Sequence, residues 1–264
     1  MGAATQSPPD SETQQTSGVY VYGIFPGDIE LTGEQSGVGK PPGKVRIVRS
    51  KGLAALVSEV DLAQPLGTPE DLTAHKNILD ASAAEVPVLP MRFGAVLASE
   101  DAVASELLDA NHDDFTQALG ELDGRTEYVV KGRYLEDAIL LEVLSENREA
   151  AQLADEIRDA DPDATRDARI RLGEFISEAI TAKREEDTRT VGERMQGHCS
   201  ASLVREPTHE RDAVHVAFLL DEDQVGQLEQ IAEDLARAWA DRIQLRLLGP
   251  MAAYDFVGTT APGG

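Results

Sequence analysis

The sequence predicts an α+β protein built as two domains. In both halves of the chain, runs of aromatic and β-branched residues alternate with stretches of helical periodicity. A chain of 264 residues can form one large or two modest domains. Gly124 separates a helical stretch from a strand pattern and is the expected boundary. We therefore expect an N-terminal mixed α+β domain over 18–123 and a second domain over 124–258, between a disordered tail (1–17) and a flexible tail (259–264).

The first domain is expected to begin with a strand and a hairpin. The run VYVYGIF follows Gly18 and is typical of a strand, whereas residues 26–44 hold many Gly and Pro and predict a long exposed loop. The segments KVRIVRS and GLAALVSEV are separated only by Lys51 and Gly52, which predicts a hairpin. Because the second segment is nearly all apolar, we expect it to be a central strand.

A helix start signal follows the hairpin. Thr68 is a suitable N-cap, and Pro69 suits the first helical position. The Asp71 carboxylate, three residues after Thr68, can accept a hydrogen bond from the backbone N–H of this cap residue. Helical spacing then predicts one apolar stripe that contains a histidine: Leu72, His75, Leu79, Ala83 and Val86. Pro87 is expected to end this helix.

The run VLPMRFGAVLAS predicts a short strand that leaves a tight bend, because Pro, Arg, Phe and Gly fall within a few residues. Ser99 is expected to cap a second helix. The segment HDDFTQALGEL predicts a third helix, with Asn111 as its cap. The side chains expected to face inward on it are Phe115, Leu119 and Leu122.

The second domain is expected to open with the strand TEYVVKGRY, which alternates so that Tyr128, Val130 and Tyr134 lie on one face. A long helical region follows, from about Leu135 to Met195, and it is broken near DADPDAT. Pro162 is expected to stop one helix there and Thr165 to start the next. The final stretch, AKREEDTRTVGERMQG, is so charged that we expect it to project into solvent.

The remaining elements complete a recognisable order. HCSASLV and AVHVAFLL predict two strands, Asp221 and Gln224 form a capping box for a helix, and RIQLRLLGP alternates as a last strand. Residues 125–249 thus run strand, helices, strand, strand, helix, strand. This is the split βαβ order of a modified ferredoxin-like domain with an extended helical crossover.

Composition narrows the classes of partner. The net charge is −24, from 48 acidic and 24 basic residues, so nucleic acid and anionic membrane surfaces would repel the chain. A run of about 20 apolar residues is missing, so we expect no membrane span. The single cysteine, Cys199, excludes an intrachain disulfide and a cysteine zinc site, which favours a reducing cytoplasm.

The residues that could carry chemistry do not form a catalytic pattern. His75 lies on an apolar helical face and is interpreted as a core histidine, and the five histidines lack metal-ligand spacing. Cys199 follows His198, but neighbouring strand residues point to opposite faces, so we interpret the cysteine as a small core residue. We expect no catalytic residue, metal ligand or cofactor.

Arg92, in PMRFG, has two interpretations. The favoured one is structural: an arginine beside a tight turn pairs with a carboxylate and caps carbonyl groups. In the other interpretation Arg92, together with Phe93 and Gly94, is an exposed contact for a partner chain, since arginine and aromatic residues are enriched at binding hot spots.

Several segments resemble the gas vesicle protein F/L family: YVYGIF, GLAALVSEV, DLTAHKNIL, VLPMRFGAVLASE, EYVVKGRY and GPMAAYDFV. VLPMRFGAV with the upstream AHKNIL is the most specific, and the terminal GP-x-x-x-Y-x-F-V supports it. Together the segments cover residues 18–258 in the family's order. The resemblance leaves open whether the chain is an F or an L paralogue.

The resemblance implies a non-enzymatic minor component or accessory protein of gas vesicles, with no cofactor. Such a protein would bind the hydrophobic shell protein A, keep it from aggregating and support vesicle nucleation and assembly. Other gas vesicle accessory proteins would be further partners. The implied location is the cytoplasm and the gas vesicle, including its gas-facing surface, where some members have been placed.

The alternative from another class is a small-ligand-binding or enzymatic ferredoxin-like protein, because such domains host both functions. That alternative requires a pocket with convergent polar groups and perturbed titratable residues.

Overall fold

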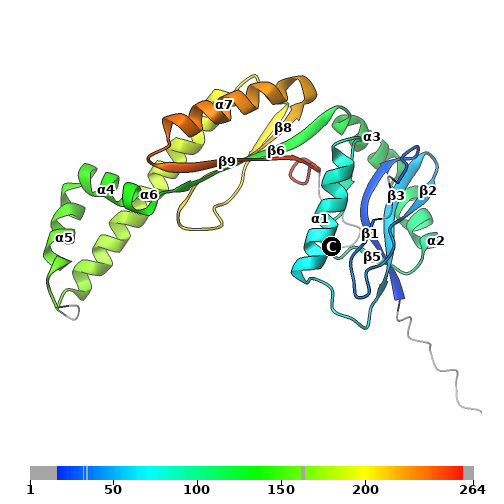
Figure 1. The fold of residues 1–264 in the computed structure, drawn as a ribbon, viewed down its shortest axis with the longest axis horizontal. Helices are drawn as coiled ribbons and strands as arrows, with labels where there is room; N and C mark the ends of the chain where they lie inside the picture. Colours follow the sequence, from blue (N-terminus) through cyan, green and yellow to red (C-terminus); the bar gives the residue numbers. More distant parts are fainter. Residues whose placement is uncertain (1–16, 32, 34, 162–163, 258–264) are drawn as a thin grey trace, which may run out of the picture. The chain divides into compact units, whose positions relative to one another are not determined.

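The computed structural model describes residues 17–31, 33, 35–161 and 164–257. Helices and antiparallel sheets make the protein an α+β protein, as the sequence predicts (Figure 1). The described chain divides into two compact units. The first comprises the residues up to Leu79 together with Val88–Gly120, and the second comprises Asp80–Pro87 and the residues from Glu121 onward.

The first unit is built on a five-stranded sheet in which β2, β3, β1 and β4 are neighbours in that order, and β5 also pairs with β1. Its strands are β1 (Ser17–Pro26), β2 (Arg46–Ser50), β3 (Leu53–Asp61), β4 (Leu89–Pro90) and β5 (Val96–Leu97). Its helical segments are α2 (Glu100–Ala102), the π-helical stretch Val103–Asp109, and most of α1 (Pro69–Ala83) and α3 (His112–Leu122), whose last residues belong to the second unit.

The hairpin predicted at Lys51 and Gly52 is present. Ser50 of β2 pairs with Leu53 of β3, and both turn residues have positive φ, 48° for Lys51 and 86° for Gly52. A type I′ hairpin turn requires positive φ at two consecutive residues, and glycine adopts positive φ without steric cost. β3 lies between β2 and β1, so the apolar strand is central, as its composition predicts.

The first turn of α1 forms as predicted, but its buried face is rotated. The Asp71 carboxylate accepts hydrogen bonds from the backbone N–H groups of Gly39, Gly67 and Thr68 and from the Thr68 hydroxyl. These bonds pull Asp71 inward. The buried side chains are Asp71, His75, Ile78 and Leu79, whereas Leu72 is 49% exposed. The prediction that Leu72 faces the core is therefore wrong.

The second unit contains a four-stranded antiparallel sheet in the order β7-β8-β6-β9, which is consistent with the ferredoxin-like order expected from the sequence. Its strands are β6 (Arg125–Tyr134), β7 (Ala201–Val204), β8 (Asp212–Asp221) and β9 (Ile243–Met251). Its helices are α4 (Glu136–Glu146), α5 (Arg148–Arg158), α6 (Arg166–Met195) and α7 (Val225–Ala238), the last preceded by the short 3₁₀ helix Glu222–Gln224.

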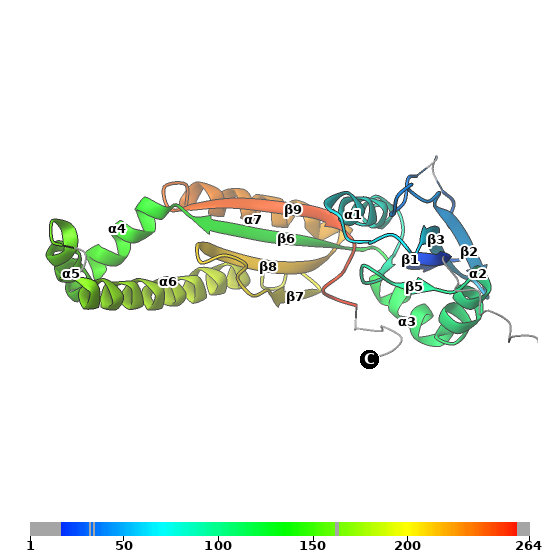
Figure 2. The same ribbon diagram turned by 90° about the horizontal axis from the view of Figure 1, so that it is seen from below.

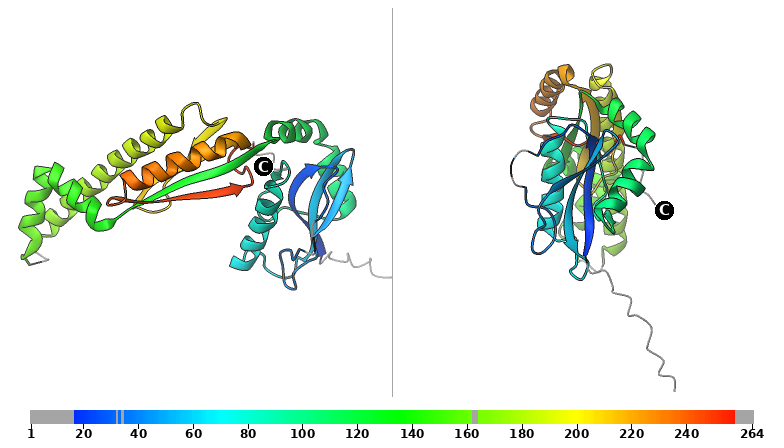
Figure 3. Two further views of the ribbon diagram at one scale, coloured as in Figure 1. Left: turned by 45° about the horizontal axis from the view of Figure 1, so that its top comes forward. Right: turned by 90° about the vertical axis from the view of Figure 1, so that its right-hand side faces the viewer.

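One face of this sheet carries the core of the second unit. Alternate residues of β6, β8 and β9 pack there against α7 and against the C-terminal part of α6 (Figure 3). The shared face predicted for Tyr128, Val130 and Tyr134 of β6 is confirmed and lies in this core, and the capping box between Asp221 and Gln224 is confirmed as well. Figure 2 shows α4, α5 and the first part of α6 extending past the end of the sheet. A small apolar cluster there includes Ala150, Leu153 and Leu172.

The charged end of α6 does not project into solvent, contrary to the prediction. Val191 and Met195 are fully buried against the sheet, and Asp187 is only 5% exposed. The helix can pack here because partners from other elements neutralise its inward charges, as when Arg242 pairs with Asp187 and Glu142 with Lys183.

The break in the helical crossover lies near DADPDAT as predicted, because α5 ends at Arg158 and α6 begins at Arg166. Pro162, the expected stop, lies outside the described residues. A second break at Asn147 separates α4 from α5, where the Asn147 side chain accepts a hydrogen bond from the backbone N–H of Ala150.

Candidate partner-binding site

The turn Arg92-Phe93-Gly94 is held in place from within the first unit. Gly94 has a φ of 93°, and its backbone N–H donates to the hydroxyl of Tyr20 at 3.2 Å. The ring of Phe93 lies 5.7 Å from that of Tyr20 and 5.6 Å from that of His75. Phe93 and Gly94 therefore anchor the turn to the core of this unit.

Arg92 has no recorded part in these anchoring contacts. Its side chain is exposed, and within the described part of the chain no carboxylate pairs with its guanidinium. Other arginines of this unit behave differently: Arg46 pairs with Glu100, and Arg49 donates to the carbonyl groups of Gly27 and Ile29. Among the described residues, Arg92 therefore lacks the carboxylate partner that the structural interpretation expects, and its role as a partner contact stays a prediction.

His75 is buried at 5% exposure, and its Nδ1 lies 2.9 Å from the hydroxyl of Tyr20. The ring also stacks with Tyr22, 5.8 Å away between centroids. These contacts are those of a histidine that packs and hydrogen-bonds in the core.

A second candidate surface is a groove of about 940 Å³ in the second unit, between the C-terminal half of α6 and strand β7. Its apolar lining comes from both walls and from the sheet beneath: Met195, Cys199, Ala201, Val204 and Val214. We call this the β7–α6 groove. Most of its exposed lining surface is apolar, and charged side chains of α6 and of the segment after β7 also line it.

β7 is an edge strand, because among the described strands only β8 pairs with it. Leu203 is 44% exposed and Val204 is 62% exposed. The backbone N–H of Arg205 donates to the carbonyl of His215, which fixes the alternation of the antiparallel ladder. The backbone groups of Ser202 and Val204 therefore point away from β8.

Several charged groups that line the groove are already engaged. Arg184 donates to the carbonyl groups of Asp212 and Glu210, at 2.6 and 2.7 Å. Arg205 donates to the carboxylate of Glu127 at 2.7 Å. Neutral carbonyl groups leave the positive charge of Arg184 in place, and the other lining charges without an ion pair among the described residues are those of Glu185, Arg189 and Glu193 on α6 and of Glu206 after β7.

Cys199 lines the groove but is poorly suited to be a nucleophile. It lies before β7, half-buried against the core of the second unit, and its Sγ is 3.7 Å from the carbonyl oxygen of Met195. Burial raises the pKa of the Cys199 thiol, so the reactive thiolate is disfavoured. The neighbouring His198 is exposed.

Among the described residues, no group of three or more His, Cys, Asp or Glu side chains is arranged to hold a metal ion. A separate search of the same residues finds no helix with the length and apolar character needed to traverse a lipid bilayer.

The family model described as "Gas vesicle synthesis protein GvpL/GvpF" matches residues 18–258. This chain belongs to the GvpL/GvpF family. The resemblance drawn from the sequence segments is thereby confirmed, and the chain has a role connected with gas vesicles.

Individual members of the GvpL/GvpF family are similar to this chain over most of its length. It is 34% identical over 242 residues to gas vesicle protein F of Streptomyces sp. (strain CB03234), which covers 90% of this chain and 98% of the relative. It is 27% identical over 270 residues to gas vesicle protein L of the same strain, with 90% and 92% covered.

Solved structures of GvpF share the fold of this GvpL/GvpF chain. The crystal structure of GvpF from Microcystis aeruginosa has a TM-score of 0.72 and 20% identity, covering 90% of this chain and 98% of that one. GvpF from Anabaena sp. PCC7120 has a TM-score of 0.74 and 23% identity, with 93% and 100% covered.

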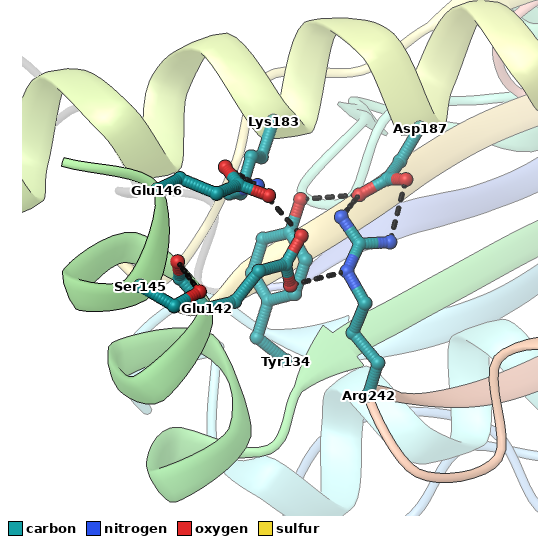
Figure 4. A network of polar contacts seen from close by, with 7 residues as sticks. All are labelled: Tyr134, Glu142, Ser145, Glu146, Lys183, Asp187 and Arg242. Carbon is teal, nitrogen blue, oxygen red and sulfur yellow. Dashed lines mark hydrogen bonds and ion pairs between the residues drawn. The ribbon is translucent and has the colours of Figure 1, made fainter.

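A polar network fixes the wall that α6 contributes to the groove of this GvpL/GvpF protein (Figure 4). Arg242 donates to Asp187 of α6 and to Glu142 of α4, while the hydroxyl of Tyr134 donates to Asp187 at 2.5 Å. Lys183 of α6 donates to Glu142 and to Glu146 of α4. The network joins α4, α6, β6 and the turn before β9, so α6 is held against the sheet.

Burial and pairing act in opposite directions on this network. Burial alone would raise the pKa of Glu142, but hydrogen bonds from Lys183 and Arg242 hold that pKa below its ordinary value. Burial raises the pKa of Tyr134, and the bond to Asp187 raises it further, so the phenol stays protonated and remains a donor.

Sequence reasoning missed the β7–α6 groove because it placed the end of α6 in solvent. One local signal was available. β7 is short, its residues are partly polar, and Pro207 follows it closely, all of which are features of edge strands.

Proposed function

We propose that this chain is a non-enzymatic assembly factor of gas vesicles. It binds the hydrophobic shell protein A, keeps that protein from aggregating, and supports nucleation and assembly of the vesicle. It works in the cytoplasm and at the vesicle, including the gas-facing surface, and contacts other gas vesicle accessory proteins. Membership of the GvpL/GvpF family over residues 18–258 supports this role. The net charge of −24 favours solubility of a complex with an aggregation-prone subunit.

The observation that carries the proposal is the exposed Arg92 on a turn that the core holds rigid. Phe93 and Gly94 fix the backbone beneath the exposed Arg92 side chain. Arginine is enriched among residues that dominate binding energy, and a turn with a fixed backbone loses little backbone entropy on binding. The proposed contact is therefore Arg92, with Phe93 and Gly94 as its support and apolar flank.

Co-expression with shell protein A tests the proposal. The wild-type chain is expected to copurify with the shell protein and to raise its soluble fraction. Arg92→Ala is expected to weaken copurification by about tenfold, the size typical of a binding hot spot.

Arg171→Ala is the matched control, because Arg171 is an exposed arginine in the second unit and its loss changes the net charge by the same amount. If the wild-type chain leaves the shell protein insoluble and does not copurify with it, the proposed function is wrong. If the wild-type chain binds and Arg92→Ala binds equally well, the function stands but this turn is not the contact.

A further inference from the structure

We propose that the β7–α6 groove binds an extended segment of the partner, which adds to the free edge of β7 as a fifth strand. The inference rests on the proposed function for the identity of that partner, shell protein A. It adds a second contact surface that is independent of the turn at Arg92.

The backbone of β7 provides the first part of the recognition. The N–H and C=O groups of Ser202 and Val204 point away from β8, and among the described residues no backbone group pairs with them. A row of such groups is a ready template for another strand. Strand addition to an exposed edge uses these groups for affinity and adjoining pockets for specificity.

The side-chain lining provides the second part. Ser202 and Val204 pair with Phe218 and Val216 of β8, so their side chains lie on the same face of the sheet as the core under α6. An added strand would place every second side chain on this face, over the apolar lining of the groove. The groove would thus bury apolar side chains that are exposed in an isolated strand.

Gly192 leaves the room that such a strand needs. It lies on the groove side of α6, and a Cβ added to it would meet no atom within 4 Å. Glycine inside a helix is less stable than alanine there. Its position beside the β7 edge lets another backbone approach the helix closely, as a strand in the groove must do.

The charges of the rim indicate which chemistry fits. Glu185, Glu193 and Glu206 outnumber Arg184 and Arg189, so these lining charges are on balance acidic beside the apolar lining. A second copy of this chain, with its net charge of −24, would be repelled. The fitting occupant is an uncharged, apolar segment flanked by a basic residue. Since β7 has four residues, the paired segment is about four or five residues long.

Filling the groove is the direct test. Gly192→Leu places a side chain in it, and the open space around Gly192 and the helix preference of leucine leave the fold intact. The wild-type chain and this variant are each co-expressed with shell protein A, and the copurified shell protein is quantified. We expect at least about a tenfold reduction for the variant. Gly226→Leu is the matched control, because Gly226 is an exposed helical glycine of α7 with equally open surroundings.

Hydrogen exchange of the wild-type complex tests the geometry without any substitution. The amides of Ser202 and Val204 are expected to exchange at least about tenfold more slowly in the complex than in the free chain. The amide of Arg205, already bonded to His215, serves as the internal reference.

The outcomes separate the two proposals. If the wild-type chain binds shell protein A while Gly192→Leu binds equally well and the Ser202 and Val204 amides gain no protection, strand addition at β7 is wrong and the proposed function stands. If the wild-type chain does not bind shell protein A at all, the proposed function fails, and this inference fails with it.

Discussion

Arg242 donates hydrogen bonds from both of its Nη atoms to the carboxylate of Asp187, at 2.8 and 2.9 Å, across 55 positions of the chain. The pair connects the turn before β9 to the second half of α6. The carboxylate is nearly buried and also accepts from Tyr134. A buried carboxylate that loses its cation keeps the cost of desolvation and loses the compensating attraction.

Arg242→Met is therefore expected to lower the free energy of unfolding by about 3 kcal/mol. Urea denaturation at neutral pH measures the change. Combining Arg242→Met with Asp187→Leu removes the stranded charge and is expected to recover part of the loss. A single variant as stable as the wild type would show that the pair does not hold α6 in place.

The Asp71 carboxylate is predicted to stabilise the first unit in a pH-dependent way. Burial raises its pKa, but the bonds from Gly39, Thr68 and Gly67 outweigh this and hold the pKa below its ordinary value. The charged form is thus favoured in the folded state. Its stabilisation is present above the ordinary pKa of an aspartate and is lost as the pH falls through the lowered folded-state pKa.

Asp71→Asn keeps the size of the side chain but turns an amide toward some of these donors. We expect a loss of about 2 kcal/mol at pH 7, and a smaller difference from the wild type in acid. Asp114→Asn, an exposed acid in the first turn of α3, is the control and should change little. An Asp71→Asn deficit that is constant with pH would contradict the assigned role of the charge.

Glu127 is predicted to have the opposite pH dependence to Asp71, because its pKa is raised in the folded state. It is fully buried in β6, and burial raises its pKa to about 7 despite the ion pair with Arg205. The folded state therefore holds the proton more tightly than the unfolded state between the ordinary value of 4.5 and about 7. Stability contributed by this group falls as the pH rises through that window, by up to about 3 kcal/mol.

Glu127→Gln removes the titration. The difference in unfolding free energy between this variant and the wild type, measured from pH 4.5 to 8, is expected to shift in favour of the variant as the pH rises. If that difference is flat across the window, the carboxylate is ionised throughout and Arg205 outweighs burial.

In the turn at Arg92, we predict that Phe93 stabilises the fold and that Arg92 contributes little to stability. Phe93→Ala removes ring contacts with Tyr20 and His75, and we expect a loss of about 2 kcal/mol. Arg92→Ala is expected to change stability by less than about 0.5 kcal/mol, because its side chain is exposed. Thermal and urea unfolding of both variants check this. A large loss for Arg92→Ala would mean that the arginine is structural after all.

Features encoded by near neighbours could be predicted from the sequence. The Lys51-Gly52 turn, the bonds between Thr68 and Asp71, and the capping box of Asp221 and Gln224 each involve residues within a few positions. The strand faces followed from alternation, which the pleat of a strand imposes locally. The family resemblance rested on such short segments as well, and the match over residues 18–258 confirmed it.

Only the tertiary structure decided what the charged residues do. The sequence predicts that the end of α6 is a solvated helix, yet Lys183 donates a hydrogen bond to Glu142, 41 positions away, and Arg242 donates one to Glu142, 100 positions away. The sequence favours a carboxylate partner for Arg92, yet none of the described carboxylates forms an ion pair with it. A charge is stabilised by whichever partner the fold brings near. The spacing of residues along the sequence does not identify a partner that lies many positions away. For the same reason, the identity of β7 as a free edge of the second sheet, and the groove beside it, became visible only once the strands were placed in order.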